Sequence, residues 1–172
     1  MKTMLYAGRF LALVKEGHWE YGDRTTATGA TIILAETGEG GILLVEQYRI
    51  PVHSHTIELP AGIIGDEPDA GDESKVQAAR RELLEETGYV AERIEALTTG
   101  PASSGVTSEI VTLFHATGLQ RIGDGGGVAH EGITVHEVSL DRVDQWLADK
   151  AAAGVLIDPK IYAGLYFLGK RQ

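Results

Sequence analysis

The apolar residues of this chain gather in short runs that are separated by polar and glycine-rich segments. Several runs carry the branched and aromatic side chains that pack well in a pleated sheet. These runs predict strands at residues 10–14, 19–21, 30–34, 42–47, 56–59, 94–98, 110–117 and 134–138. A glycine-rich turn at residues 37–41 joins two of them and predicts a hairpin. The pattern therefore predicts a sheet-based protein.

One long segment, residues 73–89, has the spacing of a helix instead. Val76, Ala79 and Leu83 recur three and four residues apart, so they are expected to form a core-facing stripe. Gly88 tolerates a positive φ and is expected to end the helix. A central helix is therefore expected between the fifth and the sixth of the predicted strands.

Two further helices are expected near the C-terminal end of the chain. Ser139 or Asp141 is a candidate cap for a helix that runs to about Lys150. Asp158 followed by Pro159 is typical of the cap and the first position of a helix, and predicts a final helix after it. Together with the central helix, these segments indicate a sheet flanked by helices.

Three glutamates of the central helix point to chemistry. Glu82, Glu85 and Glu86 are three and four residues apart, so their carboxylates share one face of the helix. Like charges at this spacing destabilise a helix, so the cluster calls for a compensating partner. Carboxylate oxygens suit Mg²⁺ or Mn²⁺, and such an ion would cancel the repulsion. A solvated acidic face is the alternative.

Composition narrows the class of protein. The 172 residues are expected to form one domain with its own core. The net charge of −10 disfavours duplex nucleic acid as a partner, but not a small phosphorylated substrate held through metal ions. Cysteine is absent, and no run is long and apolar enough for a signal peptide or a membrane span, so a cytoplasmic protein is expected. The glycine run at residues 123–127 predicts a mobile loop.

The central helix also carries a motif. Glu73 is followed after seven residues by Arg81 and then by the letters ELLEETGY, and this frame resembles the box of the Nudix hydrolase family. In that box a glycine stands six residues before the first glutamate, where this chain has Glu67. The nearest fit is Gly62, which implies five extra residues in a loop at residues 63–72. A motif with this many fixed positions is specific.

The resemblance extends beyond the helix and is strongest to the ADP-ribose and ADP-sugar pyrophosphatase branch of the family. It implies an α/β/α sandwich with a mixed central sheet and an extra N-terminal antiparallel sheet, in one Nudix domain over residues 1–172. One departure is Ser104, which stands where this branch usually has a proline, although Pro101 occurs three residues earlier. The resemblance rests on Gln47-Tyr48-Arg49, Glu58-Leu59-Pro60-Ala61-Gly62, residues 103–109 and Val135-His136-Glu137-Val138.

The resemblance implies a Mg²⁺-dependent hydrolase that cleaves the diphosphate of a nucleoside diphosphate sugar. ADP-ribose is the expected substrate, with AMP and ribose 5-phosphate as the products. GDP-mannose, ADP-glucose and dinucleoside polyphosphates are alternatives within the same class. From another class, a catalytically inactive nucleotide-binding Nudix module is the alternative, and it is disfavoured because the glutamates of the box are all present.

By the same resemblance, the metal ligands are expected to be Glu82, Glu85 and Glu86, together with the carbonyl oxygen of Ala61. Mg²⁺ is the expected ion, with Mn²⁺ as the alternative. Glu85 is expected to share a second ion and is counted among the catalytic groups. Arg81 is expected to orient a carboxylate of the box through charge-assisted hydrogen bonds rather than to touch the substrate.

The general base should come from outside the box, because metal-bound carboxylates keep little basicity. In this branch it lies on a late flexible loop, where the matching residue of this chain is Glu131. A simple exposed loop acid is the alternative interpretation of Glu131. Glu137, on the strand that follows, is the other candidate for the base.

Four residues are expected on the substrate side. Arg49 is expected to clamp a phosphate or ribose phosphate, and Glu109 to contact the substrate. Glu58 is expected either to contact substrate or metal, or to neutralise an arginine. Trp19 matches the place where relatives stack the adenine ring, with a core or interface position as its alternative. Residues 1–25 are expected to form a homodimer interface, in which Trp19 of one chain faces the substrate of the other.

Overall fold

A computed structural model of the protein describes residues 1–27, 29–65, 74–127 and 132–171. The chain order of its elements is β1 (Lys2–Ala7), β2 (Leu11–Glu16), β3 (Trp19–Arg24), β4 (Gly29–Glu36), β5 (Gly41–Arg49), the short 3₁₀ helix η1 (Ile50–Val52), β6 (Ser54–Glu58), β7 (Ala61–Ile64), α1 (Lys75–Thr87), β8 (Tyr89–Pro101), β9 (Ile110–Arg121), β10 (Thr134–Ser139), α2 (Val143–Ala152), β11 (Leu156–Ile157) and α3 (Lys160–Arg171).

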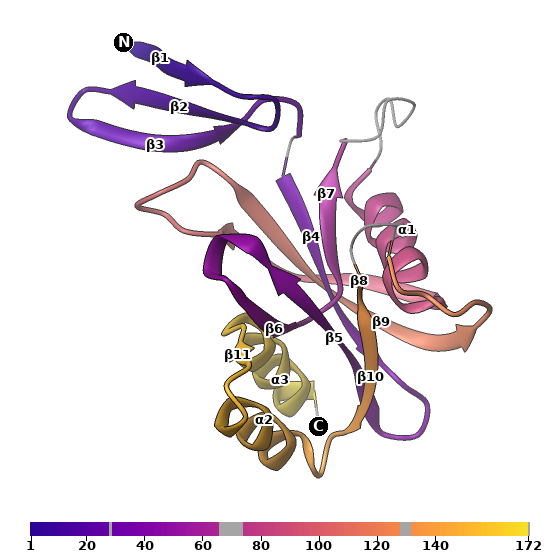
Figure 1. The fold of residues 1–172 in the computed structure, drawn as a ribbon. Helices are drawn as coiled ribbons and strands as arrows, with labels where there is room; N and C mark the ends of the chain where they lie inside the picture. Colours follow the sequence, from indigo (N-terminus) through magenta and orange to yellow (C-terminus); the bar gives the residue numbers. More distant parts are fainter. Residues whose placement is uncertain (28, 66–73, 128–131, 172) are drawn as a thin grey trace.

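Eight of these strands form one mixed sheet. Their order is β11-β6-β5-β4-β9-β8, with β7 added beside β4 and β10 beside β5. The β4–β9 and β6–β11 pairs are parallel, and the other pairs in this sheet are antiparallel. Helix α1 lies on one face of the sheet, and α2 and α3 lie on the other (Figure 1). The predicted α/β/α sandwich is therefore confirmed.

Two apolar clusters fill the two faces of this sheet. Ile32 and Leu34 of β4 pack toward α2 and α3, whereas Ile33 packs toward α1. Ala79 and Leu83 meet Ile33 from the helix and are fully buried, as their spacing predicted. Because successive residues of a strand point to opposite faces, the unbroken apolar run in β4 reflects a sheet that is covered on both sides.

The ends of α1 are set by two caps. Ser74 and Gln77 form a capping box, in which each side chain accepts a hydrogen bond from the backbone N–H of the other residue. At the other end, Gly88 adopts a φ of 77°, and its N–H donates to the carbonyl of Leu84. The predicted stop at Gly88 is confirmed, and the helix itself is shorter than residues 73–89.

One of the three predicted core residues of α1 is exposed. Val76 keeps 38% of its surface in solvent, so its assignment to the core stripe was wrong. The reason is its place in the first turn, because the buried stretch of α1 begins two residues later at Ala78. Periodicity identified the correct face of the helix, but not how far the sheet extends beneath it.

The segment after the Glu58–Gly62 motif is a strand, not the start of a long loop. β7 pairs antiparallel with β4 and places Gly62 opposite Thr31. The loop expected at residues 63–72 was therefore wrong for its first two residues, and residues 66–73 lie outside the described part of the chain. Pairing with β4 holds this strand beside α1, which is what brings Gly62 next to the helix.

The glycine run is a loop, as predicted, and it packs against the C-terminal end of α1; its mobility stays a prediction. Gly126 donates its N–H to the carbonyl of Glu86 at 2.8 Å, and Gly127 donates to the carbonyl of Glu85 at 3.0 Å. These bonds satisfy carbonyls that have no partner within the helix. A Cβ on Gly125 would come within 2.4 Å of the α1 backbone, so close approach explains the glycine there.

The first three strands form a separate antiparallel sheet, β1-β2-β3, seen at the top of Figure 1. One of its faces buries Ala12 and Val14, while Leu11 and Leu13, which alternate with them, are exposed. Gly22 exchanges two backbone hydrogen bonds with the loop between β8 and β9, which ties this sheet to the main one. The predicted extra N-terminal sheet is confirmed.

The two C-terminal helices, α2 and α3, lie where the sequence predicted them. The predicted N-cap residue is confirmed for α3 but not for α2. Arg142 occupies the cap position of α2, and neither Ser139 nor Asp141 caps it, because the Ser139 hydroxyl donates to the Asp141 carboxylate instead. At α3 the Asp158 carboxylate accepts the N–H of Lys160 at 2.9 Å, as a capping residue should. Within the described residues, every helix is too short or too polar to cross a membrane.

Candidate active site

A cleft of about 300 Å³ opens beside α1, where strands of the main sheet, the β8–β9 loop and the start of α3 meet. Six residues that the sequence predicted for the site line it: Arg49, Glu58, Ala61, Glu82, Glu86 and Glu109. The other lining residues are Arg24, Ala30, Ile32, Gln47, Gly62, Ile63, Ala102, Val111 and Lys160. The fold thus brings together residues that are far apart in the sequence, many of them charged.

Helix α1 places two carboxylates in this cleft. Glu82 and Glu86 lie one helical turn apart and are 9% and 5% exposed. The Glu86 carboxylate accepts the N–H of Ala61 at 3.0 Å, which fixes it against β7. Glu82 lies against Gly62, where an added Cβ would come within 1.7 Å of the carboxyl carbon. The glycine is needed because the carboxylate occupies the room of a side chain.

Arg81 holds the neighbouring carboxylates in place. Its Nη1 donates to Glu82 at 2.8 Å and to Glu85 at 3.2 Å, and its Nη2 donates to the carbonyl of Ile63 at 3.1 Å. These contacts are the ones that an orienting role requires, and Arg81 does not line the cleft itself. Glu85 also lies outside the cleft lining, so the two predicted groups sit behind Glu82 and Glu86.

The donors of the cleft fit a hard divalent cation. Mg²⁺ in phosphoryl-transfer sites is held by one or two carboxylates together with water and substrate phosphates, and Glu82 and Glu86 supply such carboxylates. The part of the chain that the structure describes contains no group of three or more acidic or histidine side chains placed to hold a metal alone. By that chemistry, Glu82 and Glu86 would hold a cation together with water and the phosphate oxygens of a ligand. The Ala61 carbonyl stays a predicted ligand.

Arg49 and Glu58 form a two-point ion pair on the wall of the cleft. Both of their N–O distances are 2.7 Å, and the hydroxyl of Thr56 donates to the same carboxylate at 2.5 Å. Burial raises the pKa of Glu58, but the hydrogen bonds from Arg49 and Thr56 outweigh it, so the pKa lies below its usual value. The geometry therefore favours the interpretation in which Glu58 neutralises an arginine over the one in which it contacts substrate or metal.

Replacing Arg49 with Met should destabilise the protein by about 1–2 kcal/mol at neutral pH, because Glu58 would stay buried without its cation. The folded-state pKa of Glu58 is lowered, so its stabilisation is present above the unfolded-state pKa and is lost as pH falls through the folded-state pKa. The difference between wild type and Arg49→Met should therefore shrink below about pH 4. Urea unfolding at both pH values measures it.

The exposed Arg93 offers a matched control, since its side chain is 72% exposed and its partner Glu95 is at 3.5 Å. Arg93→Met should change the free energy of unfolding by less than about 0.5 kcal/mol. A destabilisation by Arg49→Met that stays constant between neutral and acid pH would contradict the role of the ion pair.

Three polar residues of the cleft were not predicted: Arg24, Gln47 and Lys160. Arg24 ends a strand of the N-terminal sheet and pairs with the Glu109 carboxylate, so only the docking of that sheet brings it to the site. Lys160 pairs with Asp158 at 2.5 Å. The Asp–Pro pattern before it was recognised only as a helix start, and Arg24 had no local signal at all.

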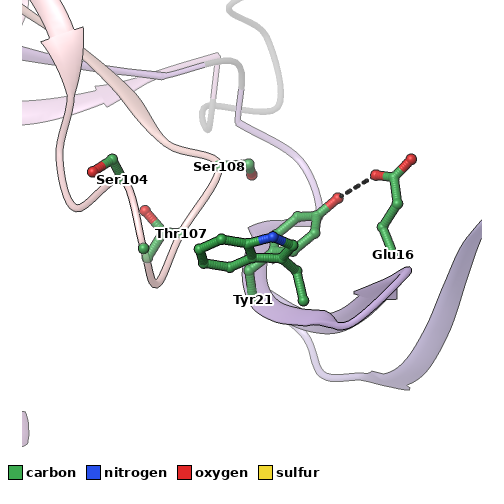
Figure 2. Close-up of a pocket in the computed structure, with 7 residues that line it drawn as sticks. Glu16, Tyr21, Ser104, Thr107 and Ser108 are labelled. Atoms are coloured by element: carbon green, nitrogen blue, oxygen red, sulfur yellow. Dashed lines mark hydrogen bonds between the residues drawn. The ribbon is translucent and has the colours of Figure 1, made fainter.

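A second hollow, of about 390 Å³, lies between the N-terminal sheet and the β8–β9 loop. Figure 2 shows the Tyr21 hydroxyl directed at Glu16, with an O–O distance of 3.3 Å. Trp19 is 53% exposed and lines this hollow rather than the cleft or the core. The two sites are neighbours in the chain, because Ser108 of the hollow directly precedes Glu109 of the cleft. The lining is Glu16, Trp19, Tyr21, Ser104, Gly105, Thr107 and Ser108.

The family of the chain follows from comparison with known sequences. Residues 23–156 match the NUDIX domain. The chain belongs to the Nudix family. It is 37% identical over 123 residues to a methanol dehydrogenase activator from Bacillus methanolicus, which covers 71% of this chain and 64% of that protein. It is also 37% identical over 116 residues to an ADP-ribose pyrophosphatase from Bacillus subtilis (strain 168), with 66% and 59% covered.

A longer match joins this Nudix chain to a GDP-mannose pyrophosphatase from Yersinia pestis (strain Pestoides F). The two are 32% identical over 149 residues, which are 81% of this chain and 72% of that protein. Alignment with the two Bacillus proteins reaches less than two thirds of their length. The crystal structure of an ADP compounds hydrolase superposes with a TM-score of 0.76 at 18% identity, covering 99% of this chain and 90% of that chain. That likeness shows the fold.

Two residues of the expected Nudix machinery lie outside the described residues. They are Glu73, the first glutamate of the box, and Glu131, the expected general base. Glu137, the other candidate for the base, is exposed on β10 and is not among the described residues that line the cleft.

Proposed function

We propose that this Nudix protein hydrolyses the diphosphate of a nucleoside diphosphate sugar, with Mg²⁺ as its cofactor and ADP-ribose as its preferred substrate. The observation that carries the proposal is the cleft, which joins the buried Glu82 and Glu86 to the Arg49–Glu58 pair. A diphosphate resists attack until its negative charge is neutralised, and this cleft offers both cations and cation-binding carboxylates. Relatives named ADP-ribose and GDP-mannose pyrophosphatases support the substrate class.

Each acidic residue of α1 has a part in this scheme. Nudix hydrolases generally use a divalent metal, which when bound would neutralise the diphosphate and polarise it as a Lewis acid. Glu82 and Glu86 would hold that ion, and Glu85 would share a second. Arg81 keeps Glu82 and Glu85 oriented, and the N–H of Ala61 keeps Glu86 oriented. The ligands are therefore preorganised before the substrate arrives.

The remaining roles fall on residues around the helix. Glu131 is our proposed general base, which would take the proton of the attacking water, with Glu137 as the alternative. Arg49 would bind a phosphate oxygen while Glu58 fixes its guanidinium, and Glu109, held by Arg24, would contact the substrate. With ADP-ribose the products would be AMP and ribose 5-phosphate.

A substrate panel tests this proposal. ADP-ribose, ADP-glucose, GDP-mannose and diadenosine polyphosphates are incubated with Mg²⁺ and a phosphatase that releases phosphate only from cleaved products. ADP-ribose should give the highest kcat/KM, with AMP and ribose 5-phosphate separated by chromatography. A higher value for GDP-mannose would favour the alternative suggested by the Yersinia relative. Binding without turnover of any compound would favour an inactive nucleotide-binding module.

We also propose a homodimer formed through the N-terminal sheet. Apolar patches on a protein surface are usually interfaces, and a two-fold interface lets one patch pair with its own copy. The expectation that Trp19 faces the substrate of the partner chain stays a prediction. The hollow that Trp19 lines is formed by residues of a single chain. It would therefore also let Trp19 stack on the nucleobase of a substrate that is bound to the same chain. The exposed apolar side chains of this sheet are Met4, Leu5, Tyr6, Leu11, Leu13 and Trp19, and Phe10 is exposed in the turn between β1 and β2.

Changing Trp19 to Ala should raise KM for ADP-ribose about 5- to 150-fold and leave kcat nearly unchanged, because stacking on a base contributes about 1–3 kcal/mol. Steady-state kinetics measures both constants, and light scattering should still find a dimer. Tyr166→Ala is the matched control, since Tyr166 is an aromatic residue of α3 that is 60% exposed and outside both sites. An unchanged KM for Trp19→Ala would remove the stacking role.

A further inference from the structure

A smaller hollow of about 150 Å³ opens off the cleft on the side of α3, and we call it the side hollow. It shares Ile32, Val111 and Lys160 with the cleft, so the two are adjacent. Its inner wall includes Pro101 and Leu113 from the β8–β9 hairpin, and Ala163 forms the wall on α3. A ligand that is held in the cleft and extends toward α3 would therefore meet the side hollow next.

The size and the lining of the side hollow favour a single ring. An apolar cavity of about 150 Å³ is large enough to take up a benzene-sized molecule. A purine nucleoside, with two fused rings and a sugar, needs far more room. The ring of a sugar has C–H faces that suit an apolar wall such as Pro101 and Val111, and hydroxyl groups at its edge. One sugar ring therefore matches this site better than a second nucleoside.

The β8–β9 hairpin sets the order of the three sites. Ser108 lines the Trp19 hollow, Glu109 lines the cleft, Val111 lines both the cleft and the side hollow, and Leu113 lines the side hollow alone. Successive residues of a strand rise about 3.3 Å, so the part of the row that lies in β9, from Val111 to Leu113, advances by about 7 Å. A ligand with three consecutive parts, laid along this edge, would meet the hollow, the cleft and the side hollow in turn.

Lys160 lies where the cleft meets the side hollow. Its ammonium is 2.5 Å from one carboxylate oxygen of Asp158, and its backbone N–H donates to the other oxygen at 2.9 Å. The Asp158 side chain is only 14% exposed, so it anchors the lysine to the first turn of α3. An ammonium has three donors, and one held here can serve a phosphate oxygen on one side or a sugar hydroxyl on the other.

We propose that the side hollow binds the group on the far side of the diphosphate from the nucleoside, and that it accepts one sugar ring but excludes a second nucleoside. This inference rests on the proposed function, because it takes the diphosphate to lie beside Glu82 and Glu86. It makes Ala163 and Lys160 specificity-determining residues of the protein. Pro101 lies three residues before Ser104, the position at which this branch of the family usually has a proline. In this proposal Pro101 contacts the bound sugar as part of the lining of the side hollow.

Ala163→Leu tests the proposal by filling the side hollow from an exposed helical position. It should lower kcat/KM for ADP-ribose about 10-fold or more, while the inhibition constant of ADP, which has no sugar on its second phosphate, changes less than twofold. Ala151→Leu adds the same atoms to an exposed position of α2 and should change neither constant. Wild type should cleave diadenosine diphosphate at least about 100-fold less efficiently than ADP-ribose.

Each contrary result has a distinct meaning. Equal efficiency on ADP-ribose in wild type and Ala163→Leu overturns the subsite and leaves the hydrolase intact. A parallel loss of ADP affinity in Ala163→Leu also overturns it, because the nucleoside would then occupy the side hollow. If the wild type cleaves nothing, the proposed function fails separately. Calorimetric titration of ADP and ADP-ribose into both proteins then decides the subsite, which requires a loss of affinity for ADP-ribose alone.

Discussion

Changing Glu86 to Gln should lower kcat for the preferred substrate by about 100-fold or more, while the fold stays intact. The substitution keeps the size of the side chain and an oxygen that can accept the N–H of Ala61, so the contact with β7 can persist. What it removes is the charge of a carboxylate that is only 5% exposed. A 100-fold loss corresponds to about 2.7 kcal/mol of transition-state stabilisation, which is within what a metal ligand supplies.

Two further measurements separate this effect from misfolding. The melting temperature of Glu86→Gln should stay within a few degrees of wild type and should still rise when ADP-ribose is added, because binding is not abolished. Glu39→Gln, in the exposed turn between β4 and β5, is the matched control and should keep full activity. Near-normal turnover of Glu86→Gln at saturating Mg²⁺ would reject Glu86 as a metal ligand.

The sequence predicted the structure best in α1, where one helix supplies both buried core residues and acidic residues of the cleft. In α1 the same periodicity that buries Ala79 and Leu83 also directs Glu82 and Glu86 into the cleft, so the helix and its acidic face were predicted together. The exposure of Val76 shows the limit of that reasoning. Periodicity describes the helix alone, whereas the end of the buried stretch depends on the strands beneath it.

Other parts of the fold were missed because they depend on segments of backbone that lie close to one another. The pattern of side chains along the sequence does not show such contacts. A glycine-rich segment suggests a flexible backbone, yet Gly126 and Gly127 donate hydrogen bonds to carbonyls at the end of α1. At Gly125 a larger residue would clash with the α1 backbone. The extra residues after Gly62 were assigned to a loop that in fact begins with a strand. In both places glycine allows a close approach that a larger residue would block.

Two of the polar cleft residues that escaped prediction, Arg24 and Lys160, depend on tertiary docking. Arg24 arrives from a second sheet, and Lys160 arrives from the last helix, so no local spacing relates them to the box. Trp19 was predicted as a substrate contact, and the structure places it in a hollow that is adjacent to the cleft but distinct from it. Local motifs thus identified the carboxylates of α1 and several residues of the surrounding walls, and the fold added Arg24 and Lys160.

Changing Gly62 to Ala should lower kcat about as much as the loss of Glu82 itself, roughly 100-fold. The φ of Gly62 is not among the positive values, so its backbone conformation suits alanine and only the space is at issue. The new Cβ would come within 1.7 Å of the carboxyl carbon of Glu82, which must then leave both the cleft and its bond to Arg81. Because a side chain moves rather than the backbone, the fold should lose only about 1 kcal/mol.

A double-mutant cycle with Glu82→Ala decides whether this explanation is correct. Removing the glutamate side chain leaves room for the new methyl group, so Gly62→Ala should cost no further stability and no further activity in that background. Gly38→Ala, where an added Cβ meets nothing within 4 Å, is the control and should leave kcat unchanged. Losses of activity that simply multiply in the double variant would mean that Gly62 acts through some group other than Glu82. The conclusion that Gly62 provides the space for the metal-binding carboxylate of Glu82 would then be wrong.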